Sequence, residues 1–162
     1  MSELSIPDLT GHPVVSREEW LAARRELLEK EKAHTRARDA LCAERRALPW
    51  VRVEKDYTFE SPTGPVSLRD LFAGRRQLLV YHFMFGPGWE EGCSGCSFIS
   101  DHVDAARQHF EHGGLSFAAI SRAPFERLEA FRRRMGWQFR WLSSAGNSFN
   151  RDFHVSFDDE DI

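Results

Sequence analysis

The sequence predicts an α/β domain with a β-α-β-α-β core of parallel strands, and three observations support this. Residues 77–85 and 115–121 form short, nearly continuous apolar runs, which are typical of buried strands. Residues 93–112 and 124–135 carry apolar residues at steps of three and four, which is the spacing of amphipathic helices. The connections between these segments are short, which implies parallel strands joined by right-handed crossovers.

Length and composition indicate one globular domain. A chain of 162 residues with 41% hydrophobic and 29% charged residues can bury a core without disulfide bonds. The net charge of −3 gives no indication of nucleic acid as a partner. No apolar run approaches the roughly 20 residues that cross a bilayer, and the N-terminus lacks the pattern of a secretory signal, so we expect no membrane association. Three cysteines do not make a disulfide scaffold, and we therefore expect a cytoplasmic protein.

The N-terminal part is expected to be a lead-in followed by one long helix. Residues 1–15 are polar and contain prolines, which predicts a flexible segment. Residues 16–48 predict the helix, because Ser16 and Glu19 form a capping-box pattern. One seam of this helix repeats every seven residues: Trp20, Leu27, His34, Leu41 and Leu48. The seam favours docking onto the chain's own domain, with a homodimer as the alternative.

Between the helix and the core, a strand and a short helix are expected. Residues 50–60 alternate in polarity as a strand does, and residues 61–65 have the composition of a turn. Residues 67–72 predict a short helical piece capped by Ser67.

The core elements follow in order. Residues 77–85 are expected to be a central strand covered on both faces, with His82 as a packed core residue, and residues 86–92 to be a loop. The helix over 93–112 is expected to bury one stripe and to end at two glycines; the stripe comprises Cys96, Ile99, Val103, Ala106 and Phe110.

The second helix begins at Pro124 in its first turn and ends at Gly136. Its apolar face comprises Phe125, Leu128, Phe131 and Met135. The basic triplet Arg132, Arg133 and Arg134 is expected on a solvated face.

Residues 138–143 and 153–157 are expected to be further strands. The domain therefore covers residues 50–157, and residues 158–162 are expected to be an acidic tail. The chain has no internal repeat.

The most specific motif is Cys93-Ser94-Gly95-Cys96, which stands between the strongest strand and an amphipathic helix. This context is typical of a thioredoxin-like redox site. Cysteines at i and i+3 of a helix start are close enough to bridge, and the free N–H groups there stabilise a thiolate. Because Cys96 continues the buried stripe while Cys93 precedes the first turn, we expect Cys93 to attack and Cys96 to resolve the mixed disulfide.

Neighbouring residues are expected to tune this pair. Glu90 and Glu91 oppose thiolate formation, and the Ser94-Gly95 dipeptide brings no positive charge. We therefore expect a moderate lowering of the Cys93 pKa and a reducing couple. Trp89 shields the disulfide, lines a partner groove, or packs in the core.

Two other interpretations of the cysteines are open: packed small residues, or half of a metal site. His102, His109 and His112 follow on the same helix, but helical spacing keeps the last two away from Cys93. No second C-x-x-C exists, so we expect neither a metal nor another cofactor. Cys42 is expected to be inert, with a third redox thiol as the alternative.

Three segments carry a resemblance to a known family: HFMFGPGWEEGCSGCSFISDHVDAA, AAISRAPFERLEAFRRRMGWQFRWLSS and NSFNRDFHVSF. They resemble a bacterial thioredoxin-like family of unknown function, whose members are predicted dithiol-disulfide oxidoreductases. The resemblance covers roughly residues 15–157. It implies a thioredoxin-like fold and a redox-active Cys93–Cys96 pair acting on a disulfide-bearing protein or a small thiol.

The lead-in YTFESPTGPVSL is also similar to that of peroxiredoxins. Their P-x-x-x-T/S-x-x-C motif is not matched, because Pro87 stands six residues before Cys93 and Glu90 three before it. A thiol peroxidase is therefore the less favoured alternative.

Thioredoxin-like folds also place a cis-proline strand and a closing hairpin after the core. Pro124 is at a helix start and is not that proline, so we expect the terminal strands to be missing. An unfinished sheet exposes a pairing edge, which favours a further alternative, a non-catalytic interaction module.

Overall fold

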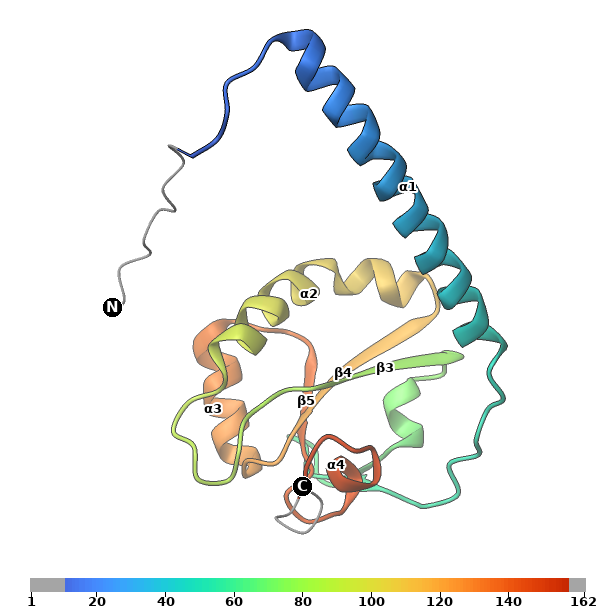
Figure 1. Ribbon diagram of the computed structural model, residues 1–162. Helices are drawn as coiled ribbons and strands as arrows, with labels where there is room; N and C mark the ends of the chain where they lie inside the picture. The colour runs from blue at the N-terminus through green and yellow to red at the C-terminus, as the bar shows by residue number, and fades with distance from the viewer. Residues whose placement is uncertain (1–10, 158–162) are drawn as a thin grey trace. The chain divides into compact units, whose positions relative to one another are not determined.

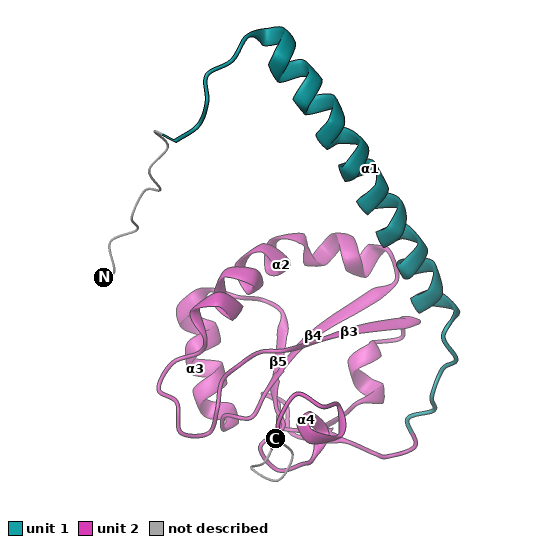
Figure 2. Ribbon diagram, in the orientation of Figure 1, with its two compact units in different colours: residues 1–53 teal, residues 54–162 magenta. Residues whose placement is uncertain are grey.

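The computed structural model describes residues 11–157 (Figure 1). The chain divides into two compact units, Met1–Val53 and Glu54–Ile162 (Figure 2). The expected acidic tail, residues 158–162, and most of the expected lead-in lie outside the described residues.

The first unit contains one long helix, α1 (Arg17–Ala47). The capping box is present: the Glu19 N–H donates to Ser16 Oγ at 3.2 Å, and the Ser16 N–H donates to the Glu19 carboxylate at 2.9 Å. No residue of α1 is buried. Docking of its seam onto the chain's own domain, or onto a second copy, stays a prediction.

The second unit contains the predicted parallel core. Strands β3 (Gln77–His82), β4 (Leu115–Ser121) and β5 (Arg140–Ser143) are all parallel. They are connected by helices α2 (Ser94–His112) and α3 (Phe125–Met135). The β-α-β-α-β prediction is therefore confirmed.

The expectation that residues 77–85 form the central strand is wrong, because the strand order is β3-β4-β5. The strand itself ends at His82, and Leu79 is 46% exposed. In β4, by contrast, every residue after Leu115 is buried. An apolar run indicates a strand, but it does not say where in the sheet the strand lies.

Two apolar clusters pack on opposite faces of this sheet. On one face, under α2 and α3, the buried residues are Phe83, Phe85, Cys96, Phe117, Ala119, Ala123, Leu128, Phe131, Trp137, Phe139 and Trp141. On the other face they are Tyr57, Phe59, Leu71, Ala118, Ile120, Leu142 and Phe149. Because side chains alternate along a strand, β4 contributes to both clusters and anchors the core.

The predicted strand over 50–60 is mostly wrong, because only β1 (Thr58–Phe59) forms, paired antiparallel with β2 (Val66–Ser67). The short helical piece is a 3-10 helix, η1 (Arg69–Phe72), whose N-cap residue is Leu68 and not the expected Ser67. The Ser67 hydroxyl nevertheless accepts from the Asp70 N–H at 3.2 Å.

The predicted strand over 153–157 is also wrong. This segment follows a short helix, α4 (Phe149–Asp152), and pairs with no strand. Its alternating apolar residues are exposed, and His154 has a left-handed φ of 54° that no regular strand adopts.

Three local expectations also need correction. Along α2, Ile99 is 46% exposed, whereas Ser100 is fully buried one turn after Cys96. Pro124 is the N-cap of α3 rather than its first helical residue. Arg132 is half-buried rather than solvated, since it donates to Glu129 and to the Trp137 carbonyl.

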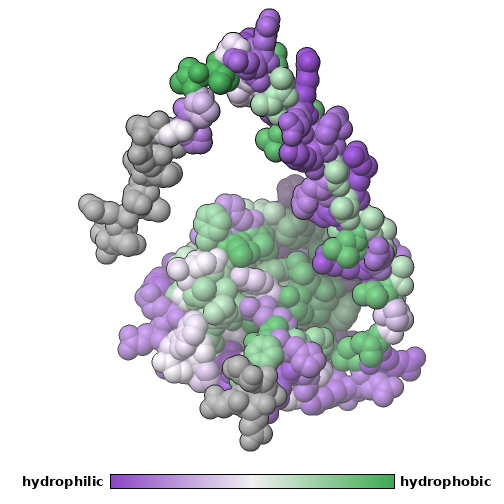
Figure 3. Space-filling view, in the orientation of Figure 1, coloured by the Kyte–Doolittle hydropathy of each residue, from purple (hydrophilic) through white to green (hydrophobic). Residues whose placement is uncertain are grey.

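The edge of β3 that faces away from β4 carries no paired strand among residues 11–157. Apolar side chains gather over β3 and β4 in the space-filling view (Figure 3). Across the same described range, no helix is long and apolar enough to span a membrane.

Candidate active site

The loop between β3 and α2 holds the cysteine motif in a fixed position. The Cys93 N–H donates to the Met84 carbonyl at 3.0 Å, which ties the start of α2 to the chain that leaves β3. From α3, the Arg127 guanidinium donates to the carbonyls of Pro87 and Trp89, at 3.0 and 2.5 Å. These bonds satisfy the loop carbonyls and fix the course of the backbone that leads to Cys93.

Gly92 is required immediately before the first cysteine. A Cβ at this position would lie 2.6 Å from Cε1 of Phe83, a buried ring of the core. Only glycine lets the backbone approach this ring so closely, and the approach brings Cys93 against the core cluster.

Cys93 is the N-cap residue of α2, and Cys96 lies in its first turn. Cys96 is 8% exposed and belongs to the core cluster, whereas Cys93 is partly buried and packs against that cluster. Both are free thiols. The sequence predicts a buried Cys96 and an exposed Cys93. Cys96 is buried as expected, whereas Cys93 is only partly exposed.

The helix start stabilises the thiolate of Cys93. Its pKa is lowered, and the largest cause is hydrogen bonding from the Cys96 N–H. The Cys96 thiol and the Gly95 N–H add to this lowering, while burial opposes it. The direction agrees with the lowering expected from the sequence.

Tyr81 is a site residue that the sequence analysis missed. Burial and the neighbouring Cys96 thiol raise the pKa of the Tyr81 hydroxyl above its ordinary value, so the hydroxyl keeps its proton. Tyr81 and Phe83 point to the same face of the chain, with ring centroids 6.1 Å apart. The period-two spacing from Phe83 and Phe85 was the available signal, because it places all three toward α2.

The expected neighbours of the pair lie as follows. Trp89 is 44% exposed and covers Gly86, so it is not a core residue. Glu91 forms an ion pair with Arg134 at 2.7 Å, and neither Glu90 nor Glu91 is a cause of the shift in the Cys93 pKa, contrary to expectation. Glu90, Ser94 and Gly95 are exposed.

The histidines do not join the cysteines. His102 contacts the Phe98 carbonyl through Nδ1 at 2.8 Å, and no group of three or more metal-ligating side chains occurs in the described part of the chain. His82 stacks on Phe149 with ring centroids 5.4 Å apart, and burial lowers its pKa. His82 is therefore a half-buried packing residue, as expected.

The fold is that of thioredoxin-like proteins. A PrxQ variant from Xylella fastidiosa aligns with a TM-score of 0.52 at 14% identity, covering 68% of this chain and 70% of PrxQ. A thiol:disulfide interchange protein from Bacteroides sp. aligns at 0.48 and 19% identity, covering 68% and 71%. The thioredoxin domain of a thiol-disulfide oxidoreductase from Bacteroides vulgatus aligns at 0.45 and 19%, covering 67% and 71%.

No protein of curated function matches the sequence. The model of one family, described as bacterial protein of unknown function (DUF899), matches residues 9–162. The chain therefore belongs to the DUF899 family.

Proposed function

We propose that this protein is a thiol-disulfide oxidoreductase that cycles Cys93 and Cys96 between a dithiol and a disulfide. The observation that carries the proposal is the asymmetry of the pair: a partly exposed N-cap thiol of lowered pKa next to a buried thiol of the same helix turn. Such an asymmetry suits a two-step exchange. The accessible Cys93 sulfur attacks the substrate disulfide first, and the buried Cys96 sulfur reacts only after the mixed disulfide has formed.

In the first step, the Cys93 thiolate attacks one sulfur of a substrate disulfide, and the other substrate sulfur leaves as a thiolate that takes up a proton. In the second step, Cys96 loses its proton and attacks Cys93 Sγ, which releases the second substrate thiol. The net change is one substrate disulfide reduced to two thiols and one Cys93–Cys96 disulfide formed. An external dithiol reductant restores the starting state.

Tyr81 assists the second step in this scheme. Cys96 is 8% exposed, so little water reaches its sulfur. The neighbouring Tyr81 hydroxyl, which remains protonated, is proposed to donate to this sulfur as negative charge develops on it. A hydrogen bond to a charged acceptor contributes about 1.5–3 kcal/mol.

The couple is proposed to be reducing, because the thiolate, and with it the reduced form, is stabilised only by backbone N–H groups and one thiol, and the dipeptide between the cysteines adds no cation. A disulfide-bearing protein or a small thiol is the proposed substrate class, and the cytoplasm the proposed compartment. A thiol peroxidase is the second candidate, favoured by the similarity of fold to PrxQ.

The test is reduction of insulin and of a small disulfide with dithiothreitol as electron donor. Wild type is compared with Cys93→Ser, with Cys96→Ser, and with Cys42→Ser as a control on α1. We expect Cys93→Ser to abolish turnover, Cys96→Ser to trap the mixed disulfide, and Cys42→Ser to match wild type. Equal rates for all four would end the proposal. Hydrogen peroxide consumption without disulfide reduction would identify the peroxidase instead.

A further inference from the structure

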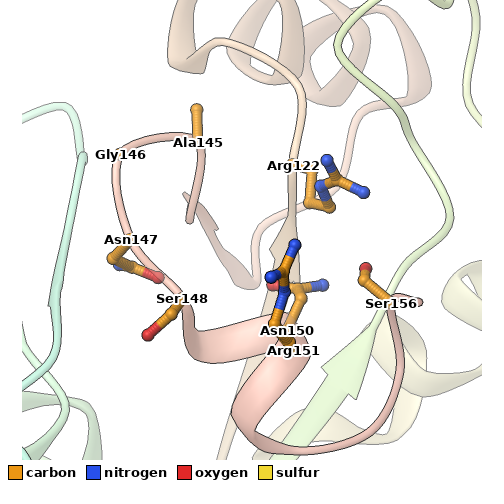
Figure 4. A pocket seen from close by; sticks show the side chains of 8 residues that line it. All are labelled: Arg122, Ala145, Gly146, Asn147, Ser148, Asn150, Arg151 and Ser156. Atoms are coloured by element: carbon orange, nitrogen blue, oxygen red, sulfur yellow. The ribbon is translucent and has the colours of Figure 1, made fainter. Parts of the chain in front are cut away.

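A cleft opens at the carboxyl ends of the parallel strands. One part, of about 450 Å³, is lined by Arg122, which follows β4, and by residues of the turn and helix after β5 (Figure 4). A second part, of about 390 Å³, shares Arg122, Asn150 and Ser156 with the first and continues to the chain that follows β3. Ligands of parallel α/β sheets commonly bind at this edge.

The first part of the cleft is suited to an anion. Its described lining contains Arg122 and no aspartate or glutamate, although the chain carries a net charge of −3. Arg122 makes no hydrogen bond or ion pair with any described residue. The side-chain oxygen Oδ1 of Asn150 accepts from Ser144 Oγ at 2.6 Å, which leaves the side-chain amide nitrogen available as a donor. Figure 4 shows Arg122, Asn150 and Ser156 around one open space.

The second part is lined by the loop that precedes the cysteines. Its wall includes Met84, which is 57% exposed, and Trp89, which is 44% exposed. The Met84 carbonyl accepts the Cys93 N–H at 3.0 Å, so this end of the cleft adjoins the start of α2. No acidic residue lines this part within the described chain. The second part of the cleft therefore combines apolar residues of the loop that precedes the dithiol with Arg122.

We propose that this cleft binds a low-molecular-weight disulfide that carries carboxylate groups. Arg122, assisted by Asn150 and Ser156, holds one carboxylate, and Met84 and Trp89 contact the carbon stem. The disulfide is then presented to Cys93, which forms a mixed disulfide and releases one carboxylate-bearing thiol. Cys96 displaces the second such thiol as the Cys93–Cys96 disulfide forms. This substrate assignment rests on the proposed function.

Three small disulfides of similar length test the charge preference: 3,3′-dithiodipropionate, a dianion; bis(2-hydroxyethyl) disulfide, which is neutral; and cystamine, a dication. We expect kcat/KM to fall in that order, with at least about a tenfold difference between dianion and dication. Arg122→Gln is expected to lower kcat/KM for the dianion by about tenfold through KM and to leave the neutral disulfide unchanged. Arg69→Gln, an exposed arginine of η1 outside the cleft, removes the same charge and serves as the control.

Binding is measured separately, by titrating the dianion into a Cys93→Ser/Cys96→Ser variant that cannot exchange disulfides. Binding that weakens with Arg122→Gln supports the cleft assignment even if wild type reduces no disulfide, a result that overturns only the proposed function. Equal turnover of all three disulfides with no effect of Arg122→Gln overturns the cleft assignment and leaves the proposed function intact. Binding that does not depend on Arg122 also overturns it.

Discussion

The Tyr81 hydroxyl lies beside the Cys96 thiol, and burial together with this neighbour raises the pKa of Tyr81. This proximity relates the strand before the motif to the buried cysteine of the helix after it. Tyr81 and Cys93 both pack against the apolar cluster that contains Cys96. The buried thiol therefore has a neutral hydroxyl and a second thiol as neighbours at the edge of this cluster.

Replacing Tyr81 by phenylalanine is expected to slow the second exchange step and to leave the first unchanged. Loss of a hydrogen bond to the developing Cys96 thiolate should reduce the rate of that step by about tenfold. Acid quenching followed by mass spectrometry should show accumulation of the Cys93 mixed disulfide. Tyr57→Phe is the control, since the Tyr57 hydroxyl donates to Asp152 on the other side of the sheet. A Tyr81→Phe enzyme that accumulates no more mixed disulfide than Tyr57→Phe would contradict this role.

The lowered pKa of Cys93 predicts the pH dependence of its reactivity. A thiol of lowered pKa becomes a thiolate at lower pH, so alkylation by iodoacetamide should rise with pH and reach half its maximum below the ordinary pKa of 9.0. The measurement is the rate of alkylation at Cys93 in a Cys42→Ser chain. A midpoint at or above 9.0 would show that the helix start does not stabilise the thiolate.

Gly92→Ala is expected to destabilise the fold and disturb the motif. The added methyl group would meet the Phe83 ring at 2.6 Å, and overpacking of this kind costs about 1–3 kcal/mol. Urea unfolding gives the loss of stability. Gly88→Ala in the same loop is the matched control, because nothing lies within 4 Å of its Cβ position. Equal stability of the two variants would refute the close approach at Gly92.

Glu129 on α3 predicts a loss of stability in acid. A hydrogen bond from Arg132, aided by Arg133, lowers its pKa from 4.5 to about 2. A carboxylate with a lowered folded pKa stabilises the fold above its unfolded pKa and loses that contribution as the pH falls toward the folded value. The difference in unfolding free energy between wild type and Glu129→Gln should therefore be full at pH 7 and shrink between about 4.5 and 2. A difference that stays constant from pH 7 to pH 2 would contradict the role of the arginine hydrogen bonds.

Much of the core was predictable because its signals are local. Strand β4 and helices α2 and α3 follow from apolar periodicity and from glycines at their ends, and these three elements largely determine the parallel topology. The segments 50–57 and 153–157 have strand-like alternation but no strand partner, and a strand forms only where a partner satisfies its backbone. Pairing is a property of the folded chain, so alternation alone cannot predict it.

The cysteine pair of the candidate site was also predictable from local sequence, whereas the residues around it were not. The spacing of Cys93 and Cys96 and their place before an amphipathic helix predicted a helix-start pair of unequal burial. Tyr81, Gly92 and Arg122 were missed, because their roles depend on contacts with residues distant in sequence or on a cleft shared by three loops.

The most direct test of the account is a redox titration of the Cys93–Cys96 pair in a Cys42→Ser chain. We expect one two-electron transition, at a potential closer to that of thioredoxin, about −270 mV, than to that of DsbA, about −120 mV. The transition should disappear in Cys93→Ser and in Cys96→Ser. If no disulfide forms between these cysteines at any potential, the central claim is wrong, and the thioredoxin fold of this chain serves a purpose other than dithiol chemistry.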